Sequence, residues 1–124
     1  MSIADLRQEY MRESLDEKDV APDPLEQFAR WFDEAVKAQM PMVNAMSLAT
    51  VSAKGRPSAR MVLLKGVDHG GFVFFTNYGS RKGRELAANP RASLCFPWFC
   101  IGRQIIVTGV VTKVTDAETD EYFA

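Results

Sequence analysis

Three cations and a hydroxyl gather in residues 80–84, which have the sequence Ser-Arg-Lys-Gly-Arg. Ser80 is a favourable N-cap residue for a short helix predicted over 81–88, which Pro90 would follow. A helix N-terminus offers free N–H groups and the positive end of a dipole, so this segment suits an anion such as phosphate. A charge run is also often only a solvated helix face, and both interpretations remain open at this point.

A second set of polar side chains stands in apolar surroundings. Arg60 and Lys65 flank four apolar residues of a predicted strand, and such cations need either a partner or a path to water. Gln104 lies in another apolar strand, where its amide is able to donate to and accept from a planar heterocycle. The same glutamine equally suits a backbone contact at a sheet edge.

The sequence gives little evidence for a metal site or for a nucleophilic side chain. The single histidine, His69, lies in a glycine-flanked turn. Cys95 and Cys100, five residues apart in an apolar stretch, are interpreted as buried thiols rather than a disulfide. We therefore predict no metal site and no catalytic nucleophile among the side chains.

Composition limits the class of protein. The chain has 124 residues, 47% of them hydrophobic and 25% charged, with a net charge of −1. These values are typical of one soluble globular domain without a general affinity for nucleic acid. No apolar run approaches the roughly 20 residues of a membrane span, and the N-terminus lacks the pattern of a signal peptide. We expect a cytoplasmic protein that contacts neither nucleic acid nor membrane.

Helices are expected at both ends of the sequence. Residues 1–22 are interpreted as a mobile arm that contains a short helix over 6–15. Asp23 and Glu26 form a predicted capping box for a helix that begins at Pro24 and ends at Pro41. A second capping box over 115–118 predicts a final helix. The core-facing stripe of the first long helix is expected to comprise Leu25, Phe28, Ala29, Phe32, Val36 and Met40.

Strands joined by tight turns fill the middle of the chain. They are predicted over 46–51, 58–67, 72–76, 92–98 and 103–114. Segment 72–76 is aromatic and β-branched throughout, which favours a central strand. The fold class is therefore mainly β with flanking helices (α+β), arranged as a small antiparallel barrel.

Several spaced motifs together resemble the pyridoxamine 5′-phosphate oxidase family, and the resemblance covers nearly the whole chain. The motifs are Leu6-Arg7-Gln8-Glu9-Tyr10, Arg60 to Lys65, Phe74-Phe75-Thr76-Asn77-Tyr78, Ser80-Arg81-Lys82-Gly83, Phe96-Pro97-Trp98, Arg103-Gln104 and Glu121-Tyr122-Phe123.

The resemblance implies an FMN-binding antiparallel split β-barrel that forms a homodimer. It implies cofactor contacts from Arg60, Met61, Val62, Leu63, Leu64, Lys65, Phe75, Thr76, Arg81, Lys82 and Gln104. It also implies substrate contacts from Arg7, Gln8, Glu9, Tyr10, Lys65 and Tyr122.

The implied reaction belongs to vitamin B6 metabolism. Pyridoxamine or pyridoxine 5′-phosphate would be oxidised by FMN to pyridoxal 5′-phosphate, and O₂ would reoxidise the flavin to give H₂O₂. The flavin carries the redox chemistry, so the lack of a protein nucleophile agrees with this reaction.

Two departures from the family keep alternatives open. The family continues past Ala124, so we expect a split-barrel domain over 23–124 that is truncated at its C-terminus. Uncharged residues replace the family's usual charges on one strand face, at Ile106, Thr108, Val110 and Thr112. Alternative hypotheses are a non-catalytic FMN-binding dimer, a truncated or engineered half-domain with a new apolar interface, and a structural module without a ligand.

Overall fold

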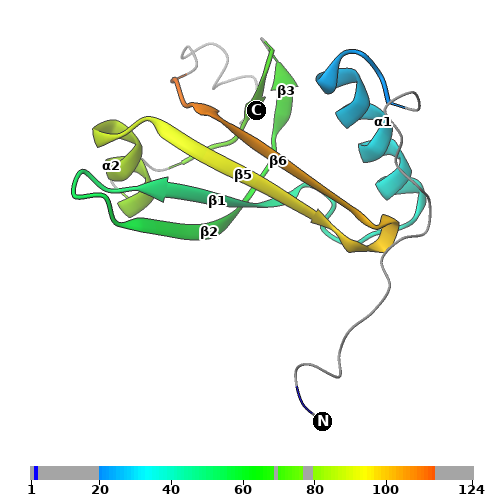
Figure 1. Ribbon diagram of the computed structural model, residues 1–124, viewed down its shortest axis with the longest axis horizontal. Helices are drawn as coiled ribbons and strands as arrows, with labels where there is room; N and C mark the ends of the chain where they lie inside the picture. The colour runs from blue at the N-terminus through cyan, green and yellow to red at the C-terminus, as the bar shows by residue number, and fades with distance from the viewer. Residues whose placement is uncertain (1, 3–19, 69, 77–79, 114–124) are drawn as a thin grey trace. The chain divides into compact units, whose positions relative to one another are not determined.

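A computed structural model describes residues 2, 20–68, 70–76 and 80–113 of the chain (Figure 1). The predicted helix over 6–15 and the predicted final helix after residue 114 lie outside these residues. The elements in chain order are α1 (Pro24–Lys37), β1 (Ala45–Val51), β2 (Pro57–Leu63), β3 (Gly66–Asp68), β4 (Gly71–Val73), α2 (Arg81–Ala88), β5 (Arg91–Trp98), the 3-10 turn η3 (Phe99–Ile101) and β6 (Arg103–Val110).

The described residues form two units. The first comprises the residues up to Val43 together with Pro97–Gln104, and so contains α1, η3 and the adjoining ends of β5 and β6. The second comprises Asn44–Phe96 and the residues from Ile105 onward, which hold the rest of the sheet and α2. Each unit has its own set of packing contacts.

In the first unit, α1 begins at the predicted cap. The Asp23 carboxylate accepts a hydrogen bond from the Leu25 N–H at 3.0 Å, and Pro24 occupies the first helical position. The reciprocal half of the predicted capping box is replaced, because the Glu26 carboxylate pairs with Arg30 one turn later at 3.0 Å. The helix therefore starts where predicted, although it ends at Lys37 rather than Pro41.

The core of the first unit is aromatic. Trp98 is 1% exposed, and its ring centroid lies 5.4 Å from that of Phe28 and 5.9 Å from that of Phe32. The indole N–H donates to the Val43 carbonyl at 3.0 Å, which satisfies the ring's one polar atom. The predicted apolar stripe is partly wrong, since Ala35 is buried while two of its predicted members, Ala29 and Val36, are exposed.

A four-stranded sheet, most of which belongs to the second unit, has the order β2-β1-β5-β6. β1 pairs antiparallel with β2 from Ala45↔Leu63 to Val51↔Pro57, and it also pairs antiparallel with β5. Alternate β1 side chains are buried, as expected for a strand whose successive residues face opposite sides of a sheet. The buried members are Met46, Leu48 and Thr50. Helix α2 packs against this strand (Figure 1).

The chain between β2 and α2 differs from the prediction. The predicted strand 58–67 ends at Leu63 and resumes as β3 at Gly66. The predicted central strand over 72–76 is wrong: β4 spans only Gly71–Val73 and pairs with β3 in a separate two-stranded sheet. A short apolar run has the same pattern in a central strand as in any other covered strand, so its place in the sheet cannot be inferred from periodicity.

The two cysteines differ in their exposure to solvent. Both thiols are free, with Cys95 half-buried. The prediction of a buried thiol is wrong for Cys100, because η3 replaces the strand there and leaves the side chain exposed.

On β6 and just beyond it, the uncharged face predicted from the sequence is exposed, with Ile106 at 61% and Val110 at 65%.

Candidate functional site

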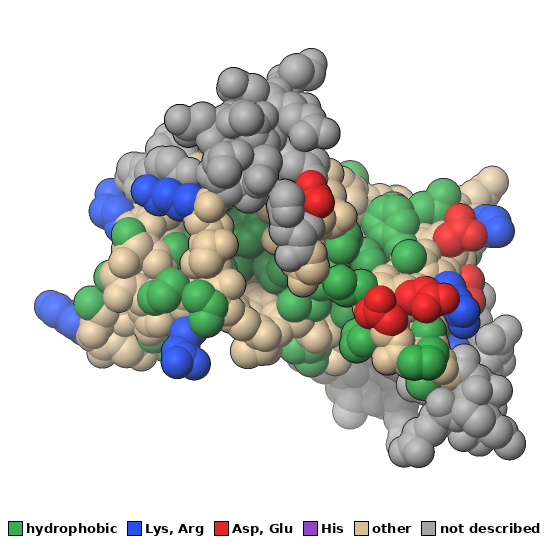
Figure 2. All heavy atoms as spheres, turned by 90° about the horizontal axis from the view of Figure 1, so that it is seen from above, with side chains coloured by type: hydrophobic (Ala, Val, Ile, Leu, Met, Phe, Trp, Pro, Cys, Tyr) green, Lys and Arg blue, Asp and Glu red, His purple; other side chains and the backbone are tan. Residues whose placement is uncertain are grey.

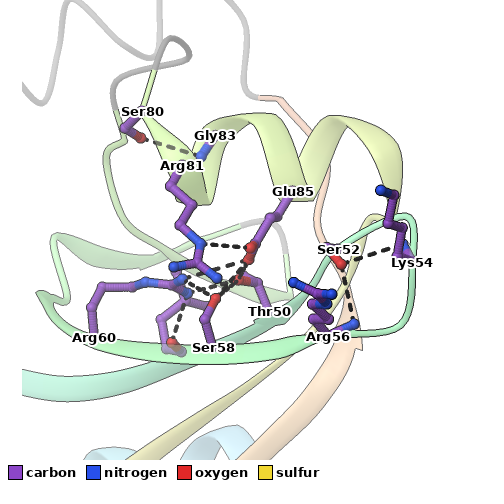
Figure 3. Close-up of polar contacts among 11 residues, drawn as sticks. Thr50, Ser52, Lys54, Arg56, Ser58, Arg60, Ser80, Arg81, Gly83 and Glu85 are labelled. Carbon is purple, nitrogen blue, oxygen red and sulfur yellow. Dashed lines mark hydrogen bonds and ion pairs between the residues drawn. The ribbon is translucent and has the colours of Figure 1, made fainter.

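Helix α2 begins with the predicted cap and presents two cations in its first turn. The Ser80 hydroxyl accepts a hydrogen bond from the Gly83 N–H at 3.2 Å (Figure 3). Arg81 is exposed and Lys82 is half-buried. Figure 2 shows Lys and Arg side chains at the end of the second unit where α2 and the β1–β2 turn lie (left). Arg81, Lys82 and the free N–H groups of the first turn make the N-terminus of α2 favourable for an anion.

Arg60, the cation predicted within an apolar strand, has hydrogen-bond partners on β1 and β2. One terminal nitrogen donates to the Leu48 carbonyl at 3.0 Å and to the Thr50 hydroxyl at 2.8 Å. The other donates to the Ser58 hydroxyl at 2.6 Å. This guanidinium is consequently fixed against β1 and β2 rather than extended freely to water.

Glu85 joins the two arginines, and sequence reasoning missed it. One carboxylate oxygen accepts hydrogen bonds from Ser58 at 2.8 Å and from Thr50, and lies 3.6 Å from an Arg60 nitrogen. The other oxygen accepts from Arg81 Nε at 3.0 Å (Figure 3). The i, i+4 spacing of Arg81 and Glu85 was the available signal. The strand partners could not be seen in the sequence, because they lie 27 and 35 residues away.

These contacts lower the pKa of Glu85 from its ordinary value of 4.5 to about 2. The hydrogen bond from Thr50 has the largest effect, followed by that from Ser58; burial opposes them, and Arg81 adds a further lowering. The side chain is 7% exposed, so its charge depends on these donors. Glu85 is therefore a carboxylate at all physiological pH values.

A pH-dependent stability follows from this lowered pKa. The folded state binds the Glu85 proton more weakly than the unfolded chain, so the contribution is complete above pH 4.5 and is lost as the pH falls toward about 2. We expect the free energy of unfolding, measured by urea titration, to decrease over this window. The decrease should be smaller in Glu85→Gln, which has no proton to bind there. Equal slopes in both proteins would contradict the assignment.

The remaining predicted cofactor residues divide by burial. Within 60–65, the Val62 and Leu64 side chains are buried. The main chain of both residues contacts the β1 side of the sheet, since Val62 pairs with Met46 and the Leu64 N–H donates to the Asn44 carbonyl at 2.8 Å. The exposed members of the segment are Met61, Leu63 and Lys65. Gln104 is exposed on β6 in the first unit. The predicted substrate residues Arg7, Gln8, Glu9, Tyr10 and Tyr122 lie outside the described part of the chain.

Thr76 provides a test of whether the site fits a ligand. Its hydroxyl oxygen is buried and has no hydrogen-bond partner among the described residues. A buried hydroxyl without a partner is unfavourable, so such an atom is expected where a bound group completes the site. It stands four residues before the Ser80 cap and beside the half-buried Phe75. An acceptor oxygen of a bound group, such as a flavin, would supply the partner that this donor lacks.

Neither a metal cluster nor a membrane helix is found in the described ranges. No group of three His, Cys, Asp or Glu side chains among these residues is arranged to hold a metal ion. None of the helices described combines the length and apolar character that crossing a bilayer requires.

The chain is similar in sequence to curated proteins of known name. The chain is 64% identical over 122 residues to the pyridoxine/pyridoxamine 5′-phosphate oxidase of Cupriavidus taiwanensis, and 61% identical over 123 residues to that of Bordetella pertussis. These alignments cover 98% and 99% of this chain but 58% and 59% of the relatives. The chain thus spans somewhat more than half the length of the curated relatives it matches.

Solved structures match the fold. PhzG from Burkholderia lata, solved with tetrahydrophenazine-1-carboxylic acid, has a TM-score of 0.82 and 32% identity, covering 88% of this chain and 55% of that one. A pyridoxamine 5′-phosphate oxidase-related, FMN-binding protein from Nostoc punctiforme has a TM-score of 0.65 and 22% identity, covering 82% and 54%. The predicted antiparallel split barrel with flanking helices is confirmed.

A family model supports the same assignment. The model described as pyridoxamine 5′-phosphate oxidase matches residues 32–124, which include every described strand and α2. The predicted resemblance is therefore confirmed, and it extends well beyond the short motifs from which it was recognised. This chain belongs to the pyridoxamine 5′-phosphate oxidase family.

Proposed function

We propose that this chain binds FMN and contributes to the oxidation of pyridoxamine or pyridoxine 5′-phosphate to pyridoxal 5′-phosphate, with O₂ as oxidant and H₂O₂ as by-product. The observation that carries the proposal is the buried hydroxyl of Thr76, which has no partner among the described residues and is close in sequence to a capped helix that presents Arg81 and Lys82. Family membership supports FMN as the group that this hydroxyl would meet.

Each residue has a distinct proposed role toward FMN. Arg81 and Lys82 would hold the phosphate, aided by the N–H groups at the start of α2. Arg60 is already ordered by its strand partners and would add a fixed positive charge. Bound FMN would supply the redox chemistry by accepting a hydride from the substrate's C4′ carbon. The protein's task is therefore to bind and orient rather than to supply a nucleophile.

Substrate contacts extend the proposal beyond the described residues. We place Arg7, Gln8, Glu9, Tyr10 and Tyr122 at the substrate with Lys65, whose exposed side chain is available to an anion. A homodimer in the cytoplasm is part of the same proposal. The curated relatives are longer than this chain, so turnover is to be tested in addition to binding.

The absorption spectrum of the purified protein tests flavin binding directly. FMN is added, the sample is desalted, and the band near about 450 nm is measured before and after. A retained band supports the site. Peroxide release on addition of pyridoxine 5′-phosphate then tests the reaction, and a protein that loses all flavin on desalting contradicts the proposal.

A second candidate function is a non-catalytic FMN-binding dimer. The observation that favours it is the exposed uncharged face of β6, where Ile106 and Val110 stand in water in the single chain. The same peroxide assay separates the two functions. Flavin retention without peroxide release, in a protein that sediments as a dimer, would favour the second.

We predict that Thr76→Val raises the stability of the unliganded protein and weakens its binding of FMN. The change keeps the side chain's shape and removes a buried hydroxyl that no described residue hydrogen-bonds, so we expect the unliganded protein to gain about 1 kcal/mol in free energy of unfolding. FMN affinity should fall by about fivefold to tenfold, because a hydrogen bond to the ligand is lost. Urea denaturation and flavin titration measure the two effects. A destabilised protein with unchanged affinity would show that the hydroxyl has a different purpose.

A further inference from the structure

We propose that Glu85 is a positioning residue for the flavin phosphate, because it holds the guanidinium groups of Arg60 and Arg81 in place before any ligand binds. The inference rests on the proposed FMN function and assigns a role to a residue that contacts no flavin in it. Glu85 lies on α2 one turn after Arg81, whereas Arg60 comes from β2. A single carboxylate thus connects cations from two separate elements (Figure 3).

The two carboxylate oxygens of Glu85 contact different arginines. Oε2 faces the strands, where it accepts from Ser58 at 2.8 Å and from Thr50 and lies 3.6 Å from Arg60 Nη2. Oε1 faces the helix and accepts from Arg81 Nε at 3.0 Å. Ser58 also accepts from Arg60 Nη2 at 2.6 Å, so its hydroxyl links that cation to the carboxylate a second time.

The contact with Arg81 leaves that side chain available to a ligand. The bond to Glu85 uses Nε, and the side chain is 67% exposed, so the two terminal nitrogens remain for phosphate oxygens. A guanidinium that donates through Nε is restricted in its rotamers before the ligand arrives. Ligand binding then carries less of the ordering cost, which is the general advantage of a preorganised site.

The negative charge of Glu85 also offsets the repulsion between Arg60 and Arg81. Two guanidinium groups that converge on one site repel each other, and the buried carboxylate between them offsets that repulsion. The three groups together keep a net charge of +1, from two cations and one anion, and Lys82 adds to it. The site therefore remains attractive to a phosphate even though one carboxylate stands beside it.

The alternative is that this network only fastens α2 to β1 and β2. That role would support the whole fold and would affect every ligand of the chain equally. A phosphate-positioning role affects only ligands that carry the phosphate. FMN and riboflavin share the same flavin ring and differ at this phosphate, so the ratio of their affinities distinguishes the two roles.

The test is Glu85→Gln in the full 124-residue chain, with dissociation constants for FMN and riboflavin measured by quenching of flavin fluorescence. We expect FMN binding to weaken by about tenfold, because the charged hydrogen bonds that order both arginines are lost, while riboflavin binding is unchanged. Glu26→Gln is the matched control, since it removes a carboxylate from a second i, i+4 Glu–Arg pair of the described residues, at the same 3.0 Å distance. This control should leave both constants unchanged.

Ser58→Ala keeps the inference testable if Glu85→Gln does not fold. It removes the hydroxyl that links Arg60 to Glu85, so we expect the same selective loss for FMN at smaller size. Equal weakening of both flavins, or tighter FMN binding, would overturn the positioning role. A wild-type protein that binds FMN no better than riboflavin would instead overturn the proposed phosphate site, and the inference with it.

Discussion

Charge reversal at both Arg81 and Lys82 is expected to abolish the retention of FMN. Each charge-assisted contact to a phosphate contributes about 1.5 to 3 kcal/mol, so losing two should weaken FMN binding by at least about 100-fold. The introduced carboxylates would also repel the phosphate at the N-terminus of α2, where anions are otherwise favoured. Flavin absorbance after desalting measures retention, and a fluorescence titration gives the dissociation constant.

The control for this prediction is a charge reversal of equal size elsewhere in the same unit. Lys54 and Arg56 lie in the turn between β1 and β2 and are both exposed. Lys54→Glu with Arg56→Glu changes the net charge by the same amount, but it leaves the α2 cations intact. We expect nearly normal retention in this control. Equal losses in both double variants would mean that FMN responds to overall charge and not to the α2 site.

The two reversals also differ in how they act, because Arg81 has a second role. Its Nε donates to Glu85, so Arg81→Glu would place two carboxylates side by side one helical turn apart. Lys82→Glu should disturb the fold less. The single variants, compared by circular dichroism melting and flavin titration, therefore separate loss of the phosphate contact from loss of α2 stability.

Local signals explain which parts of the fold could be predicted. The caps at Asp23 and Ser80 depend on residues within three positions of the helix start, and both are observed. The strand pair around the turn at 52–56 was likewise indicated by nearby glycine and proline. Gly55 adopts a φ of 82°, and the Ser52 N–H donates to the Arg56 carbonyl at 2.9 Å. Short-range chemistry determines these features, so the sequence displays them directly.

Long-range pairing explains what could not be predicted. The position of β4 depends on β3, its partner, and not on its own apolar residues. Cys100 is exposed because the chain leaves β5 at Trp98, which the alternation of side chains along the strand does not reveal.

The residues of the candidate site also divide into those that local signals predict and those that depend on long-range contacts. Arg81 and Lys82 are adjacent to a cap and Arg60 lies in an apolar strand, so the sequence itself predicts all three. Thr76 is predicted only from the family resemblance. Glu85 was missed because three of its four partners come from strands far away along the chain. A glutamate in an exposed-looking helix gives no sign of burial until the strands that cover it are known.

Trp98→Ala is expected to have the largest effect on stability. The side chain is 1% exposed, it contacts Phe28 and Phe32, and its N–H donates to Val43. Loss of a buried tryptophan costs about 3 to 5 kcal/mol, because apolar burial is lost and a cavity remains. Urea denaturation followed by far-ultraviolet circular dichroism measures the change.

Two further variants identify the physical cause of that loss. Trp98→Phe keeps an aromatic ring against α1 but removes the donor to Val43, so it should cost about 1 to 3 kcal/mol, less than the alanine variant. Phe99→Ala removes the neighbouring aromatic ring, which is 66% exposed, and should cost under about 1 kcal/mol. If Phe99→Ala destabilised the protein as much as Trp98→Ala, burial beneath α1 would not be what stabilises this unit. The expected order therefore tests whether one buried indole holds η3 and the ends of β5 and β6 to the helix.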